Sequence, residues 1–172
     1  SVTGYRPKLV VTYYSKPTTA TSASISPRYT NSSTKAKLSF SGITSSGLAR
    51  CEYRIYNYND STAANGTIKL DYSSARPIKS GAYLPSLAEG CYKIYVRGVN
   101  KAGTAGGAKT AGVVHIDKTA PVIKSAGLKD STGTDIDGKY TKETNPKIEF
   151  SGVTDKHIGQ ACIKYAIAAK GT

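Results

Sequence analysis

The sequence contains no methionine or tryptophan, and phenylalanine occurs twice. Valine, isoleucine, leucine, alanine and 13 tyrosines must therefore supply the apolar content. Serine, threonine and glycine are abundant. β-Branched and aromatic residues favour strands, and glycine and serine favour turns. We therefore expect an all-β fold.

Long apolar runs and helical periodicity are also missing. No stretch approaches the roughly 18 apolar residues of a membrane-spanning helix. No segment combines sustained helical periodicity with capping residues. The sequence predicts neither a membrane span nor helices as the main elements.

Acidic residues are scarce beside basic ones, and the net charge is +13 with a pI near 9.6. Lysine and arginine are scattered singly, which is typical of the solvated outer faces of strands. The charge still favours attraction to an anionic cell-wall polymer or an acidic glycan. No specific nucleic-acid site is predicted.

Short strands recur between about residues 25 and 117, separated by turn residues. The segments that alternate apolar and polar residues are 37–41, 51–57, 66–70, 80–84, 91–97 and 111–116, with an edge strand near 27–29. The side chains expected to face the core are Leu38, Phe40, Tyr53, Ile55, Ile68, Leu70, Tyr92, Ile94 and Val96. About seven strands in roughly 90 residues are typical of an immunoglobulin-like β-sandwich, which we predict for 27–117.

Two segments precede this sandwich. Residues 1–15 contain a strand-like run without an adjacent hairpin partner, so we predict that it ends a preceding domain or pairs with another molecule. The residues of this possible intermolecular strand are Leu9, Val10, Val11, Thr12 and Tyr13. Residues 16–26 are rich in serine and threonine with one proline, and we predict a linker there.

The sequence repeats itself after the sandwich. The run 37–44, Lys-Leu-Ser-Phe-Ser-Gly-Ile-Thr, matches 147–154, Lys-Ile-Glu-Phe-Ser-Gly-Val-Thr. A repeat at roughly one sandwich length indicates tandem domains. Residues 122–172 are predicted to form the first half of a second repeat, with strands at 122–128, 146–151 and 161–168. Because half a sandwich leaves an apolar face and an edge uncovered, we expect the chain to be a fragment or the second copy to be completed by a partner.

A short polar junction separates the two copies. It consists of Asp117, Lys118, Thr119, Ala120 and Pro121. Pro121 fixes its own φ and favours an extended Ala120. We predict a stiff boundary at 118–121.

The segments Gly90–Gly103 and Ile116–Pro121 resemble tandem bacterial immunoglobulin-like repeats of surface and secreted proteins. Those repeats have a late Gly-x-Tyr-x-Ile/Val strand and an Asp-x-Thr-Ala-Pro junction. The stretch Tyr5–Tyr13 resembles the last strand of a DNRLRE-type β-domain. Both resemblances imply an extracellular or cell-surface multi-domain protein of bacterial origin.

Three cysteines occur, Cys51, Cys91 and Cys162, without the C-x-x-C spacing of metal sites. Cys51 and Cys91 each begin a predicted strand. If those strands are antiparallel neighbours, the two residues lie roughly 20 Å apart at about 3.3 Å per residue, beyond disulfide reach. Their redox state stays open.

No catalytic grouping is recognisable, and the protein is predicted not to be an enzyme. His115 is expected to be structural, and His157 to lie exposed in a polar loop. Asp135–Gly138 lacks the full ligand series of a calcium-binding EF-hand. No metal site and no cofactor are predicted.

Outward tyrosines with nearby basic residues are the candidates for ligand contact, since such rings can stack on sugars or pack against a neighbour. The residues chosen are Tyr56, Tyr58, Tyr95 and Arg97.

Three functions are compatible with this sequence. The first is a non-catalytic spacer in an extracellular, adhesin-like multi-domain protein, with neighbouring domains as partners. The second is a filament subunit whose copies assemble by β-strand donation. The third is an accessory module that binds a glycan or an anionic polymer.

Overall fold

The computed structural model describes residues 8–139, 142 and 144–155. The chain divides into two compact units, 1–116 and 117–172, and the division falls at the first residue of the predicted junction. Among the described residues, strands dominate and the one helix is the short 3-10 helix η1 (Ser33–Lys35). The chain is therefore all-β, as its composition predicts.

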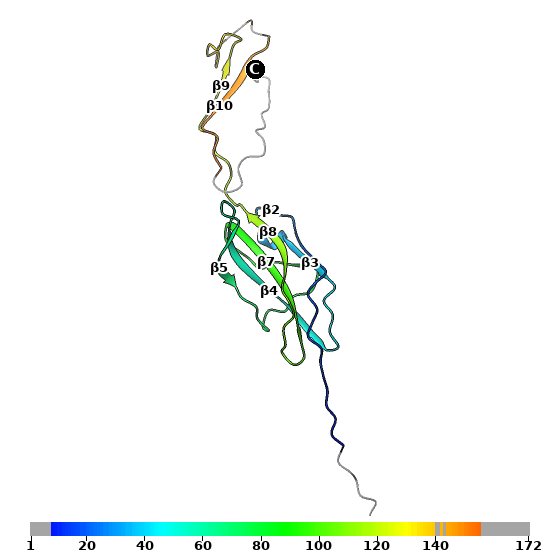
Figure 1. Ribbon diagram of the computed structural model, residues 1–172. Coiled ribbons are helices and arrows are strands. Elements are labelled where there is room, and N and C mark those ends of the chain that lie inside the picture. Colours follow the sequence, from blue (N-terminus) through cyan, green and yellow to red (C-terminus); the bar gives the residue numbers. More distant parts are fainter. Residues whose placement is uncertain (1–7, 140–141, 143, 156–172) are drawn as a thin grey trace, which may run out of the picture. The chain divides into compact units, whose positions relative to one another are not determined.

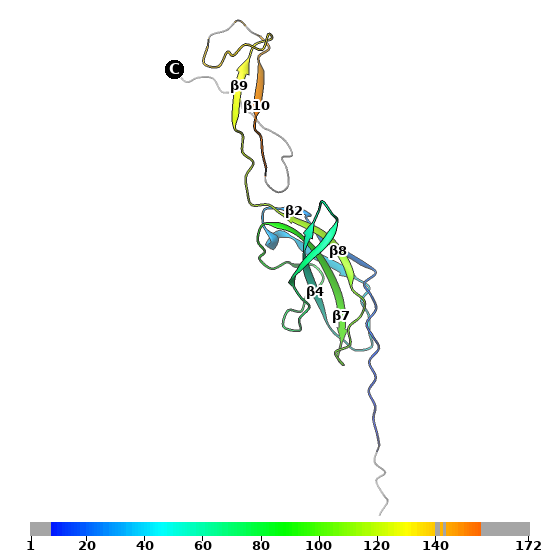
Figure 2. The same cartoon turned by 60° about the vertical axis from the view of Figure 1, so that its left-hand side comes forward.

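The first unit consists of two sheets. The smaller sheet has the order β1-β3-β6, with β1 (Ser22–Ser26), β3 (Lys37–Ser41) and β6 (Ala82–Tyr83). The larger sheet has the order β2-β8-β7-β4-β5, with β2 (Tyr29–Thr30), β8 (Lys109–Ile116), β7 (Gly90–Asn100), β4 (Leu48–Asn59) and β5 (Ala64–Leu70). All neighbours are antiparallel except β2 and β8, which are parallel. Figures 1 and 2 show β4, β7 and β8 side by side.

The alternating pattern of β7 places its apolar residues on one face. Tyr92, Ile94 and Val96 are buried, and the residues between them are only half-buried on the opposite face. Tyr53 and Ile55 of β4 are buried in the same way. These inward positions are confirmed.

Both sheets contribute to a single core. Ile25 and Leu38 come from the smaller sheet, and Ile55, Ile94 and Val114 come from the larger one. Burying one such side chain fully is worth about 1.5–3 kcal/mol. The larger sheet therefore has one face in the core and one outer face.

The predicted linker at 16–26 is wrong, because these residues belong to the first unit. Residues 22–26 form β1, which pairs with β3. The Thr18 amide donates to the Thr44 carbonyl at 2.9 Å, and Pro17 and Ala20 are buried. Strand pairing uses backbone groups that every non-proline residue carries, so a polar composition did not prevent it.

Residues 8–14 form no strand in the single chain. Leu9 is 87% exposed, and Val10, Val11 and Tyr13 are also exposed. The chain becomes attached at Tyr14 and Ser15, whose carbonyls accept hydrogen bonds of 3.4 and 3.1 Å from the side-chain amide of the buried Asn100. The segment 9–13 is thus exposed, and its proposed pairing with another molecule stays a prediction.

Ile68 does not face the core, contrary to the alternation of 66–70. It is 47% exposed, while its neighbour Leu70 packs against the core. β5 is an edge strand, and its pairing with β4 shifts register on both sides of Tyr56. Such irregularities change which face a side chain occupies, and alternation alone does not reveal them.

In the second unit, the described strands are β9 (Ser125–Lys129) and β10 (Lys147–Ser151), which pair antiparallel. They overlap the predicted strands at 122–128 and 146–151. The third predicted strand, 161–168, lies outside the described residues, and so do His157 and Cys162.

The β9–β10 pair repeats the β1–β3 pair residue by residue. Ser22 pairs with Ser41 as Ser125 pairs with Ser151. In the same way, Ala23 pairs with Phe40 as Ala126 pairs with Phe150. Ile25 pairs with Leu38 as Leu128 pairs with Ile148. Each second strand is followed by a glycine with positive φ, +75° at Gly42 and +58° at Gly152. The internal repeat therefore includes residues 22–26.

Candidate functional site

The outer face of the larger sheet carries a ladder of tyrosines and cations. Tyr56 of β4 packs edge-on against Tyr95 of β7, with ring centroids 5.6 Å apart. The Lys93 ammonium lies 5.2 Å from the centre of the Tyr58 ring and 6.0 Å from that of Tyr95. β4 and β7 pair in register here, which places these alternate residues next to one another.

The ladder continues through two arginines at Tyr72. The guanidinium carbons of Arg97 and Arg54 lie 3.8 and 4.3 Å from the centre of its ring. Arg54 also pairs with Asp71 at 2.6 Å. The structure therefore brings together the four predicted ligand-contact residues, Tyr56, Tyr58, Tyr95 and Arg97, on one face. Several of these rings thus contact cations of the same sheet, and their contact with a ligand stays a prediction.

A buried carboxylate anchors one end of the ladder. Glu52 accepts from Arg50 at 2.8 Å and from Arg97 at 3.0 Å. Burial on its own raises the pKa of Glu52, but the hydrogen bonds and charges of Arg97 and Arg50 outweigh it and hold the pKa below its ordinary value. Glu52 is therefore ionised at neutral pH and ties β4 to β7.

A second cluster, Asp60–Cys91–His115, joins three segments of the first unit. Cys91 of β7 and His115 of β8 are direct cross-strand partners, and Cys91 Sγ lies 3.1 Å from His115 Nδ1. Asp60 follows the end of β4. Its Oδ2 is 3.3 Å from Cys91 Sγ and 3.2 Å from His115 Nδ1.

This cluster does not have the geometry of a nucleophilic triad. In such triads the nucleophile and the acid bond to different nitrogens of the imidazole. Here the sulfur and the carboxylate both lie against Nδ1. Burial, together with the hydrogen bond to Asp60 and the charge of Asp60, raises the pKa of Cys91 to about 11. The thiol is therefore protonated at neutral pH, which makes it a poor nucleophile.

The sequence interpretation missed this cluster, because its members are separated by 24 to 55 residues along the chain. A symmetric hairpin centred on the turn-forming residues 100–103, Asn-Lys-Ala-Gly, would place Cys91 opposite Gly112. The hairpin does turn there, since Val99 bridges Ala105 and the Asn100 amide donates to the Thr104 carbonyl at 3.0 Å. Register irregularities farther along β7 and β8, one of them between Ile94 and Tyr95, then bring His115 opposite Cys91. The turn was thus readable from the sequence, and the register shifts were not.

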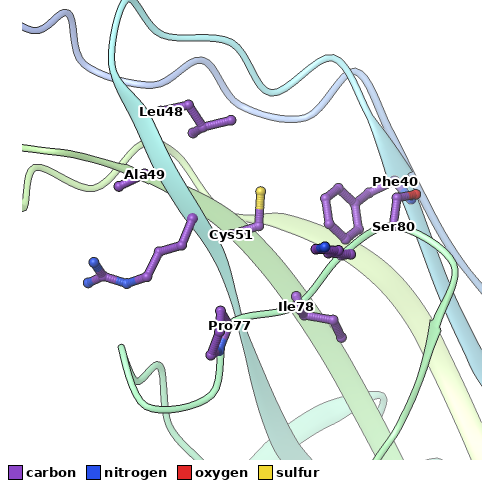
Figure 3. Close-up of a pocket in the computed structure, with 9 residues that line it drawn as sticks. Phe40, Leu48, Ala49, Cys51, Pro77, Ile78 and Ser80 are labelled. Atoms are coloured by element: carbon purple, nitrogen blue, oxygen red, sulfur yellow. The ribbon is translucent and has the colours of Figure 1, made fainter.

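An apolar pocket of about 330 Å³ opens between the two sheets. Phe40 of β3, Leu48 and Cys51 of β4 and the loop 77–80 line it, and Figure 3 shows the Cys51 thiol projecting between Leu48 and Phe40. Burial raises the pKa of this thiol. The described residues that line the pocket with Cys51 include no histidine or carboxylate.

Cys51 and Cys91 are both free cysteines. Their strands are antiparallel neighbours, and Cys51 lies opposite Gly98 rather than Cys91. At the junction, Asp117 Oδ1 accepts from the Thr119 amide at 3.0 Å, which is a local turn hydrogen bond.

No family model, curated protein or solved structure matches the chain. Among the described residues, none of the helical segments has the length and apolar character required to span a membrane.

Proposed function

We propose that the chain is a non-catalytic structural module, an immunoglobulin-like spacer from a bacterial extracellular or cell-surface multi-domain protein. The observation that carries the proposal is the repeat of the β1–β3 register in β9–β10. One module type used twice in succession is the organisation of a tandem array. Neighbouring domains are the expected partners.

The strand order supports an immunoglobulin-like topology. β1, β3 and β6 form one layer, and β8, β7 and β4 form the centre of the other. This resembles the A-B-E and G-F-C sheets of immunoglobulin domains. In this comparison, the short strand β2 corresponds to the part of the first immunoglobulin strand that crosses to the opposite sheet.

The entry and exit strands suit a spacer that carries tension. β2 runs parallel to β8, with Tyr29 opposite His115 and Thr30 opposite Ile116. The His115 amide also donates to the Arg28 carbonyl at 2.7 Å. Pulling the two ends of the unit apart loads these parallel bonds together, along the strand axis, instead of opening them one by one. The Tyr29 ring stacks on His115 at 4.5 Å and adds to the same contact.

Single-molecule pulling of the full chain from its two ends tests this mechanical role. We expect one dominant unfolding event that releases roughly 100 residues, or about 330 Å at about 3.3 Å per residue. Tyr29→Ala should lower the unfolding force because it removes the stacking between β2 and β8. Tyr83→Ala is the matched control, since Tyr83 is similarly exposed but lies on β6. Equal effects of the two substitutions would contradict a load-bearing β2–β8 contact.

The exposed segment 9–13 favours a second candidate function, a filament subunit that donates this strand to the second unit of another copy. In the first unit β3 has β1 on one side and β6 on the other. Its counterpart β10 has only β9 among the described residues, so a donated strand would take the position of β6.

Light scattering and electron microscopy of the purified chain test this assembly. Strand donation predicts regular fibres that Val11→Pro abolishes, because proline lacks the amide that a strand donates, while Val11→Ala retains them. A monomer whose segment 9–13 is cleaved readily by protease would contradict it.

A further inference from the structure

Three donor atoms of different chemistry converge at one end of the larger sheet. The pairs among Asp60 Oδ2, Cys91 Sγ and His115 Nδ1 are separated by 3.1 to 3.3 Å. We propose that Asp60, Cys91 and His115 form a binding site for a divalent transition-metal ion, with Zn²⁺ as the principal candidate.

The separations fit a tetrahedral zinc centre. Zinc bonds of about 2.3 Å to sulfur and about 2.0–2.2 Å to nitrogen and oxygen place neighbouring donors roughly 3.3–3.6 Å apart at the tetrahedral angle. The three atoms need to move apart by only a few tenths of an ångström to reach this geometry. Separations so close to those of a zinc centre do not require the strands to be rebuilt.

The donor set selects the class of ion. A thiolate, an imidazole and a carboxylate together suit zinc and its neighbours in the transition series, whereas Ca²⁺ and Mg²⁺ take oxygen ligands. Binding replaces the thiol proton of Cys91, which leaves to solvent as the sulfur becomes a ligand. Asp60 is half exposed at its side chain, so a fourth position is open to water.

The surroundings hold the ligands in place. The cross-strand pairing of β7 with β8 fixes Cys91 opposite His115. The Tyr29 ring stacks on the imidazole with an interplanar angle of 20°, which orients the ring. Asn59 Oδ1 accepts from the amides of Ser61 and Thr62 and so shapes the turn that carries Asp60. Such supporting contacts orient the ligands of established metal sites.

The ion would connect the turn after β4 to β7 and β8. This is also the end of the sheet where β2 meets β8. Metal binding should therefore raise the thermal stability of the first unit. The proposal does not depend on the spacer function, since any role of the fold is compatible with the site.

The test uses the full chain, reduced and freed of metal, and titrates it first with Co²⁺ and then with Zn²⁺. We expect one equivalent of Co²⁺ to produce a near-ultraviolet sulfur-to-cobalt charge-transfer band and visible bands of a four-coordinate ion. Zn²⁺ should displace the Co²⁺, remove the bands and raise Tm.

Four variants distinguish this site from adventitious binding. Cys91→Ser should abolish the charge-transfer band, and Asp60→Asn should weaken Zn²⁺ binding by at least about tenfold, as loss of even a supporting contact can do. The double variant Cys51→Ala/Cys162→Ala, which leaves Cys91 as the single thiol, should retain the band. His157→Ala should also retain it. Circular dichroism verifies that each variant is folded.

Two results would overturn the proposal. One is a charge-transfer band that persists in Cys91→Ser or disappears in the Cys51→Ala/Cys162→Ala chain. The other is a Zn²⁺ affinity that is the same in the unmodified chain and in Asp60→Asn, because Asp60 would then not be a ligand.

Discussion

The β1–β3 and β9–β10 pairs share a register but not an environment. Ile25 is 3% exposed, whereas Leu128 at the matching position is 36% exposed. Leu38 is fully buried, whereas its counterpart Ile148 is half-buried. Alternation and backbone pairing thus recur in both pairs, whereas the burial of the apolar side chains differs. In the first unit, β4, β7 and β8 of the larger sheet cover the apolar face of the pair.

The largest difference between the two pairs is expected for truncation of their matched core residues. Leu38→Ala should lower the free energy of unfolding of the first unit by about 3 kcal/mol, because it opens a cavity in a closed core. Ile148→Ala should leave that transition unchanged. Urea titration followed by the amide NMR signals of each unit measures both effects. A similar shift of the first unit in both variants would show that the two units share one core.

Acid should destabilise the first unit through protonation of Glu52. The pKa of Glu52 is lowered in the folded state, so its contribution to stability is fully present above the unfolded-state value of about 4.3 and is lost as pH falls through the folded value. Glu52→Gln should therefore lower the stability of the first unit at pH 7 by about 3 kcal/mol, the lower end for a broken buried ion pair, because both arginines are partly exposed. It should also flatten the decline of stability below about pH 4.3. Denaturation midpoints between pH 7 and pH 2 measure this, and an unchanged pH profile in Glu52→Gln would remove Glu52 as the cause.

The turn glycines offer a smaller matched comparison. Gly42→Ala places a methyl group against the side chain of Thr21 at positive φ, and Gly152→Ala does the same against Lys124. The left-handed conformation alone costs about 1–2 kcal/mol for a residue with a Cβ. We expect both substitutions to destabilise their own unit by at least that amount, as seen by thermal denaturation with NMR detection. Tolerance at Gly152 alone would show that the second pair does not reproduce the turn of the first.

The smallest effect is expected at the paired serines. Ser22 Oγ lies 2.8 Å from Ser41 Oγ, and Ser125 Oγ lies 2.5 Å from Ser151 Oγ. These are exposed hydrogen bonds, each worth about 0.5 kcal/mol net. Ser22→Ala and Ser125→Ala should therefore increase amide exchange slightly at the same relative positions of the two pairs. Increased amide exchange in only one of the two strand pairs would show that the pairs are not equivalent at this position.

The sequence was most informative for central strands of the sheet, in which apolar and polar residues alternate regularly. The inward positions of β4 and β7 followed from period-two patterning, because a strand in the middle of a sheet has one face fixed by the core. Alternation failed at Ile68, where an edge strand with register shifts changes the facing residue. β1 was mistaken for a linker because its serines and threonines offer little to bury. Its pairing became recognisable through the repeat with 125–129.

The functional residues were less predictable than the strands. The ladder of Tyr56, Tyr58, Tyr95 and Arg97 could be anticipated, since these residues alternate with core positions on two strands that were recognised. The cluster of Asp60, Cys91 and His115 could not, because it depends on register shifts between β7 and β8 and on the turn that follows β4. Motif spacing detects ligands that are near one another in sequence, and these ligands are near one another only after folding.

Replacing the residues of the β1–β3 pair by those of the β9–β10 pair tests most directly whether the chain contains one module twice. Five substitutions in the full chain, Ser24→Gly, Ile25→Leu, Ser26→Lys, Leu38→Ile and Ser39→Glu, convert the residues of β1 and β3 to those of β9 and β10. If the pairs are equivalent, the first unit should fold cooperatively and lose no more than about 3 kcal/mol, since the two core exchanges conserve volume. A first unit that no longer folds, with the single exchanges Ile25→Leu and Leu38→Ile each tolerated, would contradict the account.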